Sequence, residues 1–212
     1  SQTGSGTFEY GPSVSVAGSF SGGKNALIIK YNAAGVAQWA RSVVSATNTS
    51  SFSGVAVDSA GNVFAVGAQK GDAPFDYGNG AIASGAFASG NNPLIVKYDS
   101  AGNALWAKSS VAANNKSADF RKVVVDSSGD AYVIGYQQTL AAVNFGNGVI
   151  VSTSSGPDHG IIVKYNAAGM AQWGKTNQTG YGTMFNDVAV DSTNSVYVSG
   201  WGPGNSSHTY SA

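Results

Sequence analysis

Two sequence motifs alternate along the chain at a nearly constant interval, and this regularity constrains the fold more than any other feature. The first motif begins at positions 27, 94 and 161, which are equally spaced, and reads LIIKYNAAGVAQWARS, LIVKYDSAGNALWAKS and IIVKYNAAGMAQWGKT. The second motif contains Asp58, Asp126 and Asp191, and reads VAVDSAGNVFAVG, VVVDSSGDAYVIG and VAVDSTNSVYVSG. A repeat of this length predicts one supersecondary unit that is copied several times.

Each unit is predicted to contain four strands, here called A to D in chain order. Apolar and polar residues alternate on both sides of turns such as 58–62, which have the composition of hairpins. In the second unit this alternation predicts strands at about 53–58, 62–68, 93–98 and 103–109. No segment combines a 3.6-residue apolar period with capping residues, so we expect almost no helix.

An insert separates strands B and C. It contains the sequence FDYGNG at 75–80, which returns as VNFGNG at 143–148. Asn-Gly favours a tight turn with positive φ, so the insert is expected to be an extended β-ribbon or a long loop. In the first unit it shrinks to residues 19–25.

Four-stranded units with a tryptophan at the same place in the last strand are typical of β-propeller blades. The combination of VAVDSAGNVFAVG with LIVKYDSAGNALWAKS resembles the bacterial β-propeller repeat family often called SBBP, which is found in secreted and surface proteins. It is more distantly similar to NHL-type and PQQ-type blades. The resemblance covers residues 13 to 200 and implies an all-β fold of blades with four antiparallel strands. It implies no particular reaction.

The repeats amount to about three and a half blades, fewer than the four to eight of ordinary propellers. The predicted division is an N-terminal tail at 1–12, a partial blade of strands B, C and D at 13–49, blades at 50–112 and 113–180, a partial blade of strands A and B at 181–201, and a C-terminal tail at 202–212. An incomplete ring exposes sheet edges. The chain is therefore part of a longer array, or several copies assemble, or four blades close on themselves.

Composition argues against several classes of function. Eleven Lys and Arg balance eleven Asp and Glu, and this zero net charge does not suit a nucleic-acid binder or a polybasic membrane binder. No apolar run reaches the ~20 residues of a membrane helix, and no cysteine is present. Polarity comes from Ser, Thr, Asn and 29 Gly, which suits a secreted or cell-surface protein.

Two near-matches to nucleotide-binding motifs are better explained as loops. Gly18 to Lys24 has the spacing of a phosphate-binding loop, but Asn25 replaces the required Ser or Thr and a strand follows. Gly78-Asn-Gly80-Ala-Ile-Ala83 formally fits a dinucleotide fingerprint, but no βαβ unit surrounds it. No cofactor is predicted.

A calcium loop is also a weak interpretation. Asp126, Ser128 and Asp130 offer oxygen atoms at alternate positions, but Ala131 stands where an EF-hand loop needs glycine, and Glu9 is the only glutamate. We expect the aspartate to cap backbone N–H groups of its turn instead.

The histidines give little support to catalysis. His159 is expected in a loop and His208 in the tail, and neither has an equivalent in the repeated motifs. Too few His and carboxylate residues converge to predict a metal site or a triad. Burial of Asp158 and His159 in one cleft would favour an enzyme.

The repeated Lys-Tyr pairs and tryptophans suit anion or sugar binding, but we expect them to pack one unit on the next. The predicted structural residues are Asp58, Asp126, Asp191, Tyr31, Tyr98, Tyr165, Trp39, Trp106 and Trp173. The candidate contacts to a ligand or partner are Phe75, Tyr77, Phe145, His159, Tyr181 and Trp201.

The sequence favours a non-enzymatic bacterial repeat protein that serves as a structural, adhesive or assembly module. It would present the inserts at 69–92 and 136–160 many times, and would self-associate or belong to a longer parent chain. A glycan or a surface protein is a further candidate partner. One alternative is a lectin with a saccharide pocket between successive blades, which needs exposed aromatic residues in the inserts. The other is a propeller hydrolase, lyase or quinone-dependent dehydrogenase, for which no metal or quinone ligands are evident.

Overall fold

The computed structural model describes residues 1–112, 117–138, 142–153, 158–177 and 182–202. These residues form strands and turns without any helix, which confirms the all-β prediction. The strands are β1 (Gln2–Thr3), β2 (Thr7–Gly11), β3 (Val14–Ala17), β4 (Lys24–Asn25), β5 (Leu27–Tyr31), β6 (Ala37–Ser42), β7 (Ser50–Val57), β8 (Val63–Lys70), β9 (Pro74–Asp76), β10 (Ile82–Ser84), β11 (Asn91–Tyr98), β12 (Ala104–Lys108), β13 (Ala118–Val125), β14 (Ala131–Gln137), β15 (Val143–Asn144), β16 (Ile150–Val151), β17 (His159–Tyr165), β18 (Ala171–Thr176), β19 (Met184–Val190) and β20 (Val196–Trp201).

Two antiparallel sheets contain four strands each, and their strands follow one another in chain order. One sheet has the order β12-β11-β8-β7 and the other β13-β14-β17-β18. In each sheet the four strands therefore occupy positions A, B, C and D, as the alternation predicts. The remaining sheets are hairpins or pairs of two strands: β1-β4, β2-β3, β5-β6, β9-β10, β15-β16 and β19-β20.

The inserts are short hairpins, one of the two forms that the sequence predicts. β9 pairs with β10 and β15 with β16 on either side of the Asn-Gly turns. Asn79 and Asn147 have φ of 54° and 52°, the left-handed region that Asn tolerates better than most residues. The side chain of Asp76 accepts a hydrogen bond from the N–H of Gly78, and Asn144 does the same for Gly146.

The first unit departs from the prediction. Residues 1–12, predicted to be a tail, contain β1 and β2, which pair with β4 and β3. β3 has the sequence of a B strand and β5 that of a C strand, yet they lie in separate sheets. β3 pairs with β2 and lies against β6. The sequence missed β2 because Thr7–Gly11 lacks the aliphatic alternation of the repeated motifs.

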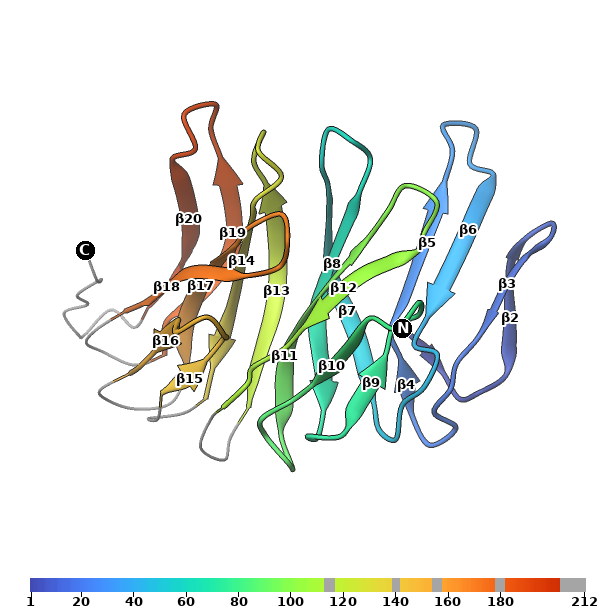
Figure 1. Ribbon diagram of the computed structural model, residues 1–212, viewed down its shortest axis with the longest axis horizontal. Coiled ribbons are helices and arrows are strands. Elements are labelled where there is room, and N and C mark those ends of the chain that lie inside the picture. Colours follow the sequence, from blue (N-terminus) through green and yellow to red (C-terminus); the bar gives the residue numbers. More distant parts are fainter. Residues whose placement is uncertain (113–116, 139–141, 154–157, 178–181, 203–212) are drawn as a thin grey trace.

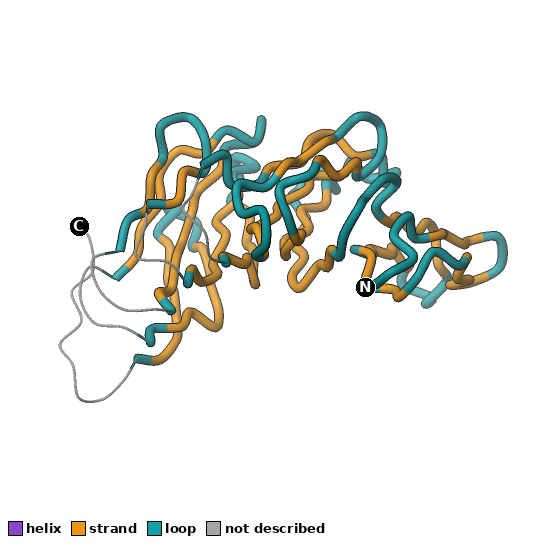
Figure 2. The backbone as a smooth tube through the Cα atoms, turned by 90° about the horizontal axis from the view of Figure 1, so that it is seen from below, coloured by secondary structure: helices purple, strands orange, loops and turns teal. Residues whose placement is uncertain are grey.

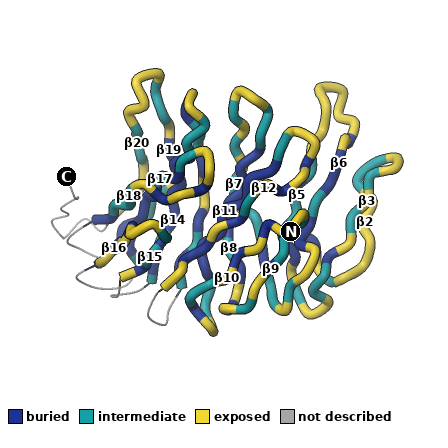
Figure 3. The backbone as a smooth tube through the Cα atoms, viewed as in Figure 1, coloured by how far each residue is buried: buried dark blue, intermediate teal, exposed yellow. Residues whose placement is uncertain are grey.

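The sheets lie side by side in a curved row, with β2 and β3 at one end and β20 at the other (Figures 1 and 2). Strand β13 packs across β7, β8 and β11, and β19 packs across β13, β14 and β17. The central strands are the most buried (Figure 3).

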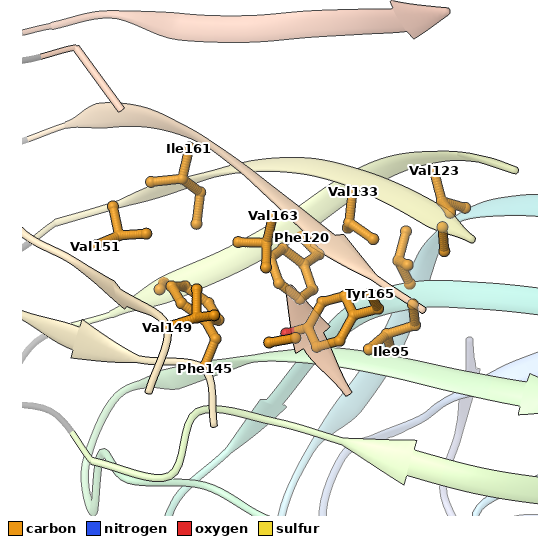
Figure 4. Close-up of a cluster of buried hydrophobic side chains, with 14 of the residues drawn as sticks. Ile95, Phe120, Val123, Val133, Phe145, Val149, Val151, Ile161, Val163 and Tyr165 are labelled. Carbon is orange, nitrogen blue, oxygen red and sulfur yellow. The ribbon is translucent and has the colours of Figure 1, made fainter. Parts of the chain in front are cut away.

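Apolar side chains fill the space between successive sheets. One cluster joins the two four-stranded sheets, with Phe120 stacked on Phe145 at 5.8 Å between ring centroids and edge-on to Tyr165 at 6.2 Å (Figure 4). A second cluster joins β6 to the first four-stranded sheet through Trp39 and Tyr98. The large aromatic side chains of the repeat therefore supply much of the core.

Candidate functional site

The repeated aspartates cap turns. Asp58 accepts hydrogen bonds from the N–H groups of Ala60 and Asn62 through one carboxylate oxygen, at 3.0 and 2.8 Å. Asp126 and Asp191 make the equivalent bonds. The hydroxyl of Thr193 and the N–H of Ser195 help to lower the pKa of Asp191 to about 2. Among the described residues, no group of three or more His, Asp or Glu side chains could hold a metal ion.

The repeated lysines and tryptophans hold the C–D turn of the following unit. Trp39 Nε1 and Lys30 Nζ donate to the carbonyl of Ser100 at 3.1 and 3.0 Å. One unit further on, Trp106 Nε1 and Lys97 Nζ both donate to the carbonyl of Ala167 at 3.2 Å. The repeated lysine and tryptophan side chains therefore bind one unit to the next.

A glycine in each turn lies directly on the tryptophan ring. A β-carbon on Gly102 would stand 2.8 Å from Trp39, and one on Gly169 would stand 2.8 Å from Trp106. Both glycines have positive φ, at 83° and 79°. The turn therefore needs glycine both for its backbone conformation and for its approach to the ring.

The repeated tyrosines differ between units. Tyr98 and Tyr165 are completely buried, and burial raises the pKa of both hydroxyls. Tyr31, at the same place in the first unit, is 50% exposed. Burial thus fits the predicted structural role for Tyr98 and Tyr165, whereas Tyr31 is exposed.

The aromatic residues of the inserts are not surface contacts, which corrects the sequence prediction. Phe75, Tyr77 and Phe145 are buried in the two apolar clusters. The Tyr77 hydroxyl donates to Gln69 Oε1 at 3.0 Å. The aromatic face of each hairpin turns inward onto the sheet.

His159 is also buried, as the first residue of β17 rather than part of an exposed loop. It has repeat equivalents after all, because Asn25, Asn92 and His159 follow one another at the interval of the first motif and are all inaccessible to solvent. Each lies at or within two residues of the start of a C strand. His159 Nδ1 lies 3.3 Å from Asn177 Oδ1. The equal spacing could have identified these three equivalent residues, but they were missed because the third is His rather than Asn.

Asp158 does not share a cleft with His159. Its side chain is partly exposed, its backbone has φ of 63°, and its carbonyl accepts the N–H of Thr183. The structure therefore does not show Asp158 and His159 buried together in one cleft, because Asp158 is partly exposed while His159 is buried.

Of the candidate contacts that fall within the described residues, Trp201 alone lies on the surface. It lies at the end of β20 and borders a hollow of about 520 Å³ with Phe185 and Val198. Tyr181 and His208 lie outside the described residues.

A hollow of about 460 Å³ separates one insert from the next and is called here the inter-unit groove. It is bordered by Ile82, Val111 and Met170, which are at least half exposed, and by Lys108 and Asn147. The aromatic residue of this lining, Phe145, is buried. The exposed apolar surface of the groove is therefore aliphatic.

The exposed aliphatic residues recur from unit to unit. Ile82 and Ile150 occupy the same place in the two inserts and are each 54% exposed. Val44 and Val111, one repeat interval apart, are similarly exposed beside the insert turns. The contacts predicted from the sequence are nearly all aromatic, so the recurrence of these aliphatic residues was missed.

None of the described residues belongs to a helix that could cross a membrane. No protein-family model matches the chain, and no curated protein matches it either.

Proposed function

We propose that the chain is a non-enzymatic repeat protein of β-propeller-type blades, secreted or displayed on a bacterial surface, which acts as a structural or adhesive module. The observation that supports this function best is the recurrence of exposed aliphatic residues at Ile82 and Ile150. A regular row of such residues gives many weak contacts of one kind, and multivalency makes their sum strong.

The blade interpretation rests on how the units are built and stacked. Each complete unit has four antiparallel strands in chain order, and each packs face to face on the next along a curved row. The lysine, tryptophan and turn of successive units bind each other in the same way twice. The repeated lysine and tryptophan side chains thus bind one unit to the next. The inserts therefore supply the surface for a partner.

A lectin is the second candidate, because the inter-unit groove lies between units where a saccharide pocket is expected. Sugar binding usually relies on an exposed aromatic ring, and the groove presents Ile82, Val111 and Met170 instead. A glycan array with a reproducible hit would favour the lectin over the adhesive module.

The adhesive role can be tested with beads that carry the purified protein at equal density. Detachment under shear from octyl-coated glass and from bacterial cells is measured for the natural chain and for the double variant Ile82→Ser, Ile150→Ser. Loss of two exposed apolar side chains per copy should reduce retention about tenfold when many copies act together.

The matched control is Leu105→Ser. Leu105 is 50% exposed on β12, close to the exposure of Ile82, but Gln38 and Gln172 stand at its repeat positions. Retention equal to that of the natural chain is expected for this control. Equal retention for the double variant as well would overturn the proposal.

A further inference from the structure

We propose that the inter-unit groove binds a small amphiphile with a straight aliphatic chain and a single carboxylate, the chemistry of a medium-chain free fatty acid. Lys108 pairs with the carboxylate, and Ile82, Val111 and Met170, which border the groove, hold the chain. This ligand site goes beyond the adhesive role proposed above and does not depend on it.

Two complete units build the groove. Residues 82–85 and 107–111 come from the unit of β7, β8, β11 and β12, and residues 145–147 and 169–171 come from the next unit. All of them lie within the described residues and between the two ends of the row. The volume of the groove, about 460 Å³, falls within the ~300–1,000 Å³ of small-molecule sites.

The exposed apolar part of the lining suits an alkyl chain. Ile82, Val111 and Met170 come from different segments and are each at least half exposed. Covering such side chains removes apolar surface from water, which favours binding. Methionine also adapts its shape to a flexible partner. The ring of Phe145 is buried, so a sugar finds no exposed aromatic face in this lining.

The charge of the lining indicates the head group. Lys108 is the only charged residue among the described residues that border the groove, and no Asp or Glu lies among them. One ammonium group balances one negative charge. A carboxylate meets this requirement, whereas a phosphate monoester carries a charge of about −2.

Lys108 does not hold the neighbouring turn as its repeat equivalent does. That equivalent is Arg41, which donates to the carbonyls of Gly102 and Ala101 at 2.8 and 3.1 Å. The Cε atom of Lys108 lies 3.1 Å from the place where a β-carbon on Gly169 would stand, so it covers the equivalent turn. Its ammonium group nevertheless makes no hydrogen bond or ion pair with any described residue. The charge is therefore available to a ligand.

The available lysine occurs at the junction that has the aliphatic wall. Ile82 belongs to the β9–β10 hairpin, which the first unit replaces by residues 19–25. Those residues contain only β4, which pairs with β1 instead of forming a hairpin. The cation is thus bound to a turn where the wall is absent and available where the wall is present. Stacking of units does not require this combination, and a ligand with both a charge and a chain explains it.

The site is tested by NMR titration of the methyl-labelled chain with octanoate at concentrations below micelle formation. The methyl signals of Ile82, Val111 and Met170 should shift together and saturate, with a Kd of about 1 mM or tighter. Octanol lacks the charge and acetate lacks the chain, so each should bind at least about fivefold more weakly. Shifts of equal size at Val44 and Ile150, which are exposed outside the groove, would indicate general adsorption and overturn the proposal.

Replacement of the lysine separates the head group from the chain. Lys108→Gln should weaken octanoate binding about fivefold and leave octanol binding unchanged, and Lys108→Arg should restore the octanoate affinity. The matched control is Lys70→Gln, because Lys70 is also exposed but does not border the groove. It should leave octanoate binding unchanged. Equal weakening by both glutamine variants, or by neither, would overturn the proposed carboxylate contact.

Replacement of the wall tests the chain. Met170→Ser removes a half-exposed side chain, and it should weaken octanoate and octanol alike by about fivefold. Leu105→Ser is the control, since Leu105 is equally exposed on β12 but lies outside the groove. Loss of affinity for octanoate alone, or equal loss in both variants, would contradict the assigned role of the wall.

A second copy of the chain and a saccharide are the competing occupants of the groove. Sedimentation velocity should show no association that Met170→Ser abolishes. Association of that kind would assign the groove to a second copy and overturn the proposal. Displacement of octanoate by a neutral saccharide would assign the groove to the lectin function and overturn it as well.

Failure of this proposal is separable from failure of the adhesive role. Ile150→Ser should weaken retention on octyl-coated glass and leave the octanoate affinity intact, because Ile150 does not border the groove. Lys108→Gln should do the reverse. Adhesion without octanoate binding would refute the groove site alone, and octanoate binding without adhesion would refute the adhesive role alone.

Discussion

At the scale of single residues, a buried asparagine near the start of the C strand organises the loop that precedes that strand in the first two units. Asn92 accepts the N–H groups of Ala86 and Phe87 through Oδ1, and donates to the carbonyls of Gly71 and Phe87 through Nδ2. Buried backbone groups must find partners. One asparagine therefore satisfies several of them at once.

Replacement of Asn92 should be costly. Asn92→Ala leaves several buried backbone groups unpaired, so we expect the free energy of unfolding to fall by about 3 kcal/mol. Asn103→Ala removes only an exposed hydrogen bond to Asp99, and a loss several times smaller is expected. Denaturant unfolding monitored by tryptophan fluorescence measures both, and similar losses would contradict the assigned role.

Asp119 should give stability a specific dependence on pH. Burial raises the pKa of its carboxyl group, and hydrogen bonds from Tyr136 and Asn91 oppose this shift only in part. The folded chain therefore holds the proton to higher pH than the unfolded chain, whose carboxyl pKa is about 3.9. The free energy of unfolding should fall as pH rises from that value through the raised folded pKa.

The variant Asp119→Asn should remove this slope, and Asp72→Asn, at an exposed position, should retain it. Unfolding curves between about pH 4 and pH 7 compare the three chains across the carboxyl window. A slope that persists in Asp119→Asn would assign the dependence to another group.

At the scale of elements, the C–D turn and the tryptophan of the preceding unit form the contact that repeats along the chain. This turn needs glycine for two reasons, the positive φ and the close approach to the tryptophan ring. Comparison of Gly102 with Gly35 separates them, because both have positive φ but only Gly102 lies on a ring. Gly35→Ala should cost about 1 kcal/mol from backbone strain. Gly102→Ala should cost at least about 1 kcal/mol more, because the methyl group collides with Trp39.

Thermal and denaturant unfolding measure this difference at a dilution where copies do not associate. Equal losses for the two glycine variants would show that the tryptophan yields to the methyl group, and that the close approach contributes little. A larger loss for Gly35→Ala would contradict the geometry of both turns.

Alternation predicted the strands well because each β-strand directs successive side chains to opposite faces. The four strands predicted near 53–58, 62–68, 93–98 and 103–109 correspond to β7, β8, β11 and β12. Alternation does not say which face another element will cover. Phe75 and Tyr77 were therefore placed beside a predicted Asn-Gly turn and expected to contact a ligand, but their burial depended on a sheet contact that spacing alone does not determine.

The first unit illustrates the other limit. Residues 13–18 repeat the B motif, yet β3 pairs with β2, whose sequence shows no repeat. Pairing between strands is decided by competition among all available edges, including those formed by unrelated segments such as Gln2–Thr3.

At the scale of the whole molecule, the row of sheets has an interior and two ends. Among the strands that the structure describes, β8, β11, β14 and β17 have neighbours on both edges, whereas β5 and β20 have a described neighbour on one edge. In a repeat array, stability is the sum of contributions from units and from the contacts between neighbours. The terminal strands should therefore open more often than the central strands.

Hydrogen exchange measured by mass spectrometry tests this gradient. About half of the amides of an edge strand point away from its one partner, so peptides from β5 and β20 should exchange at least about 100-fold faster than those from β8 and β14 at low concentration. The interior peptides act as the internal reference. Exchange in β5 and β20 as slow as in β8 and β14 would contradict this gradient.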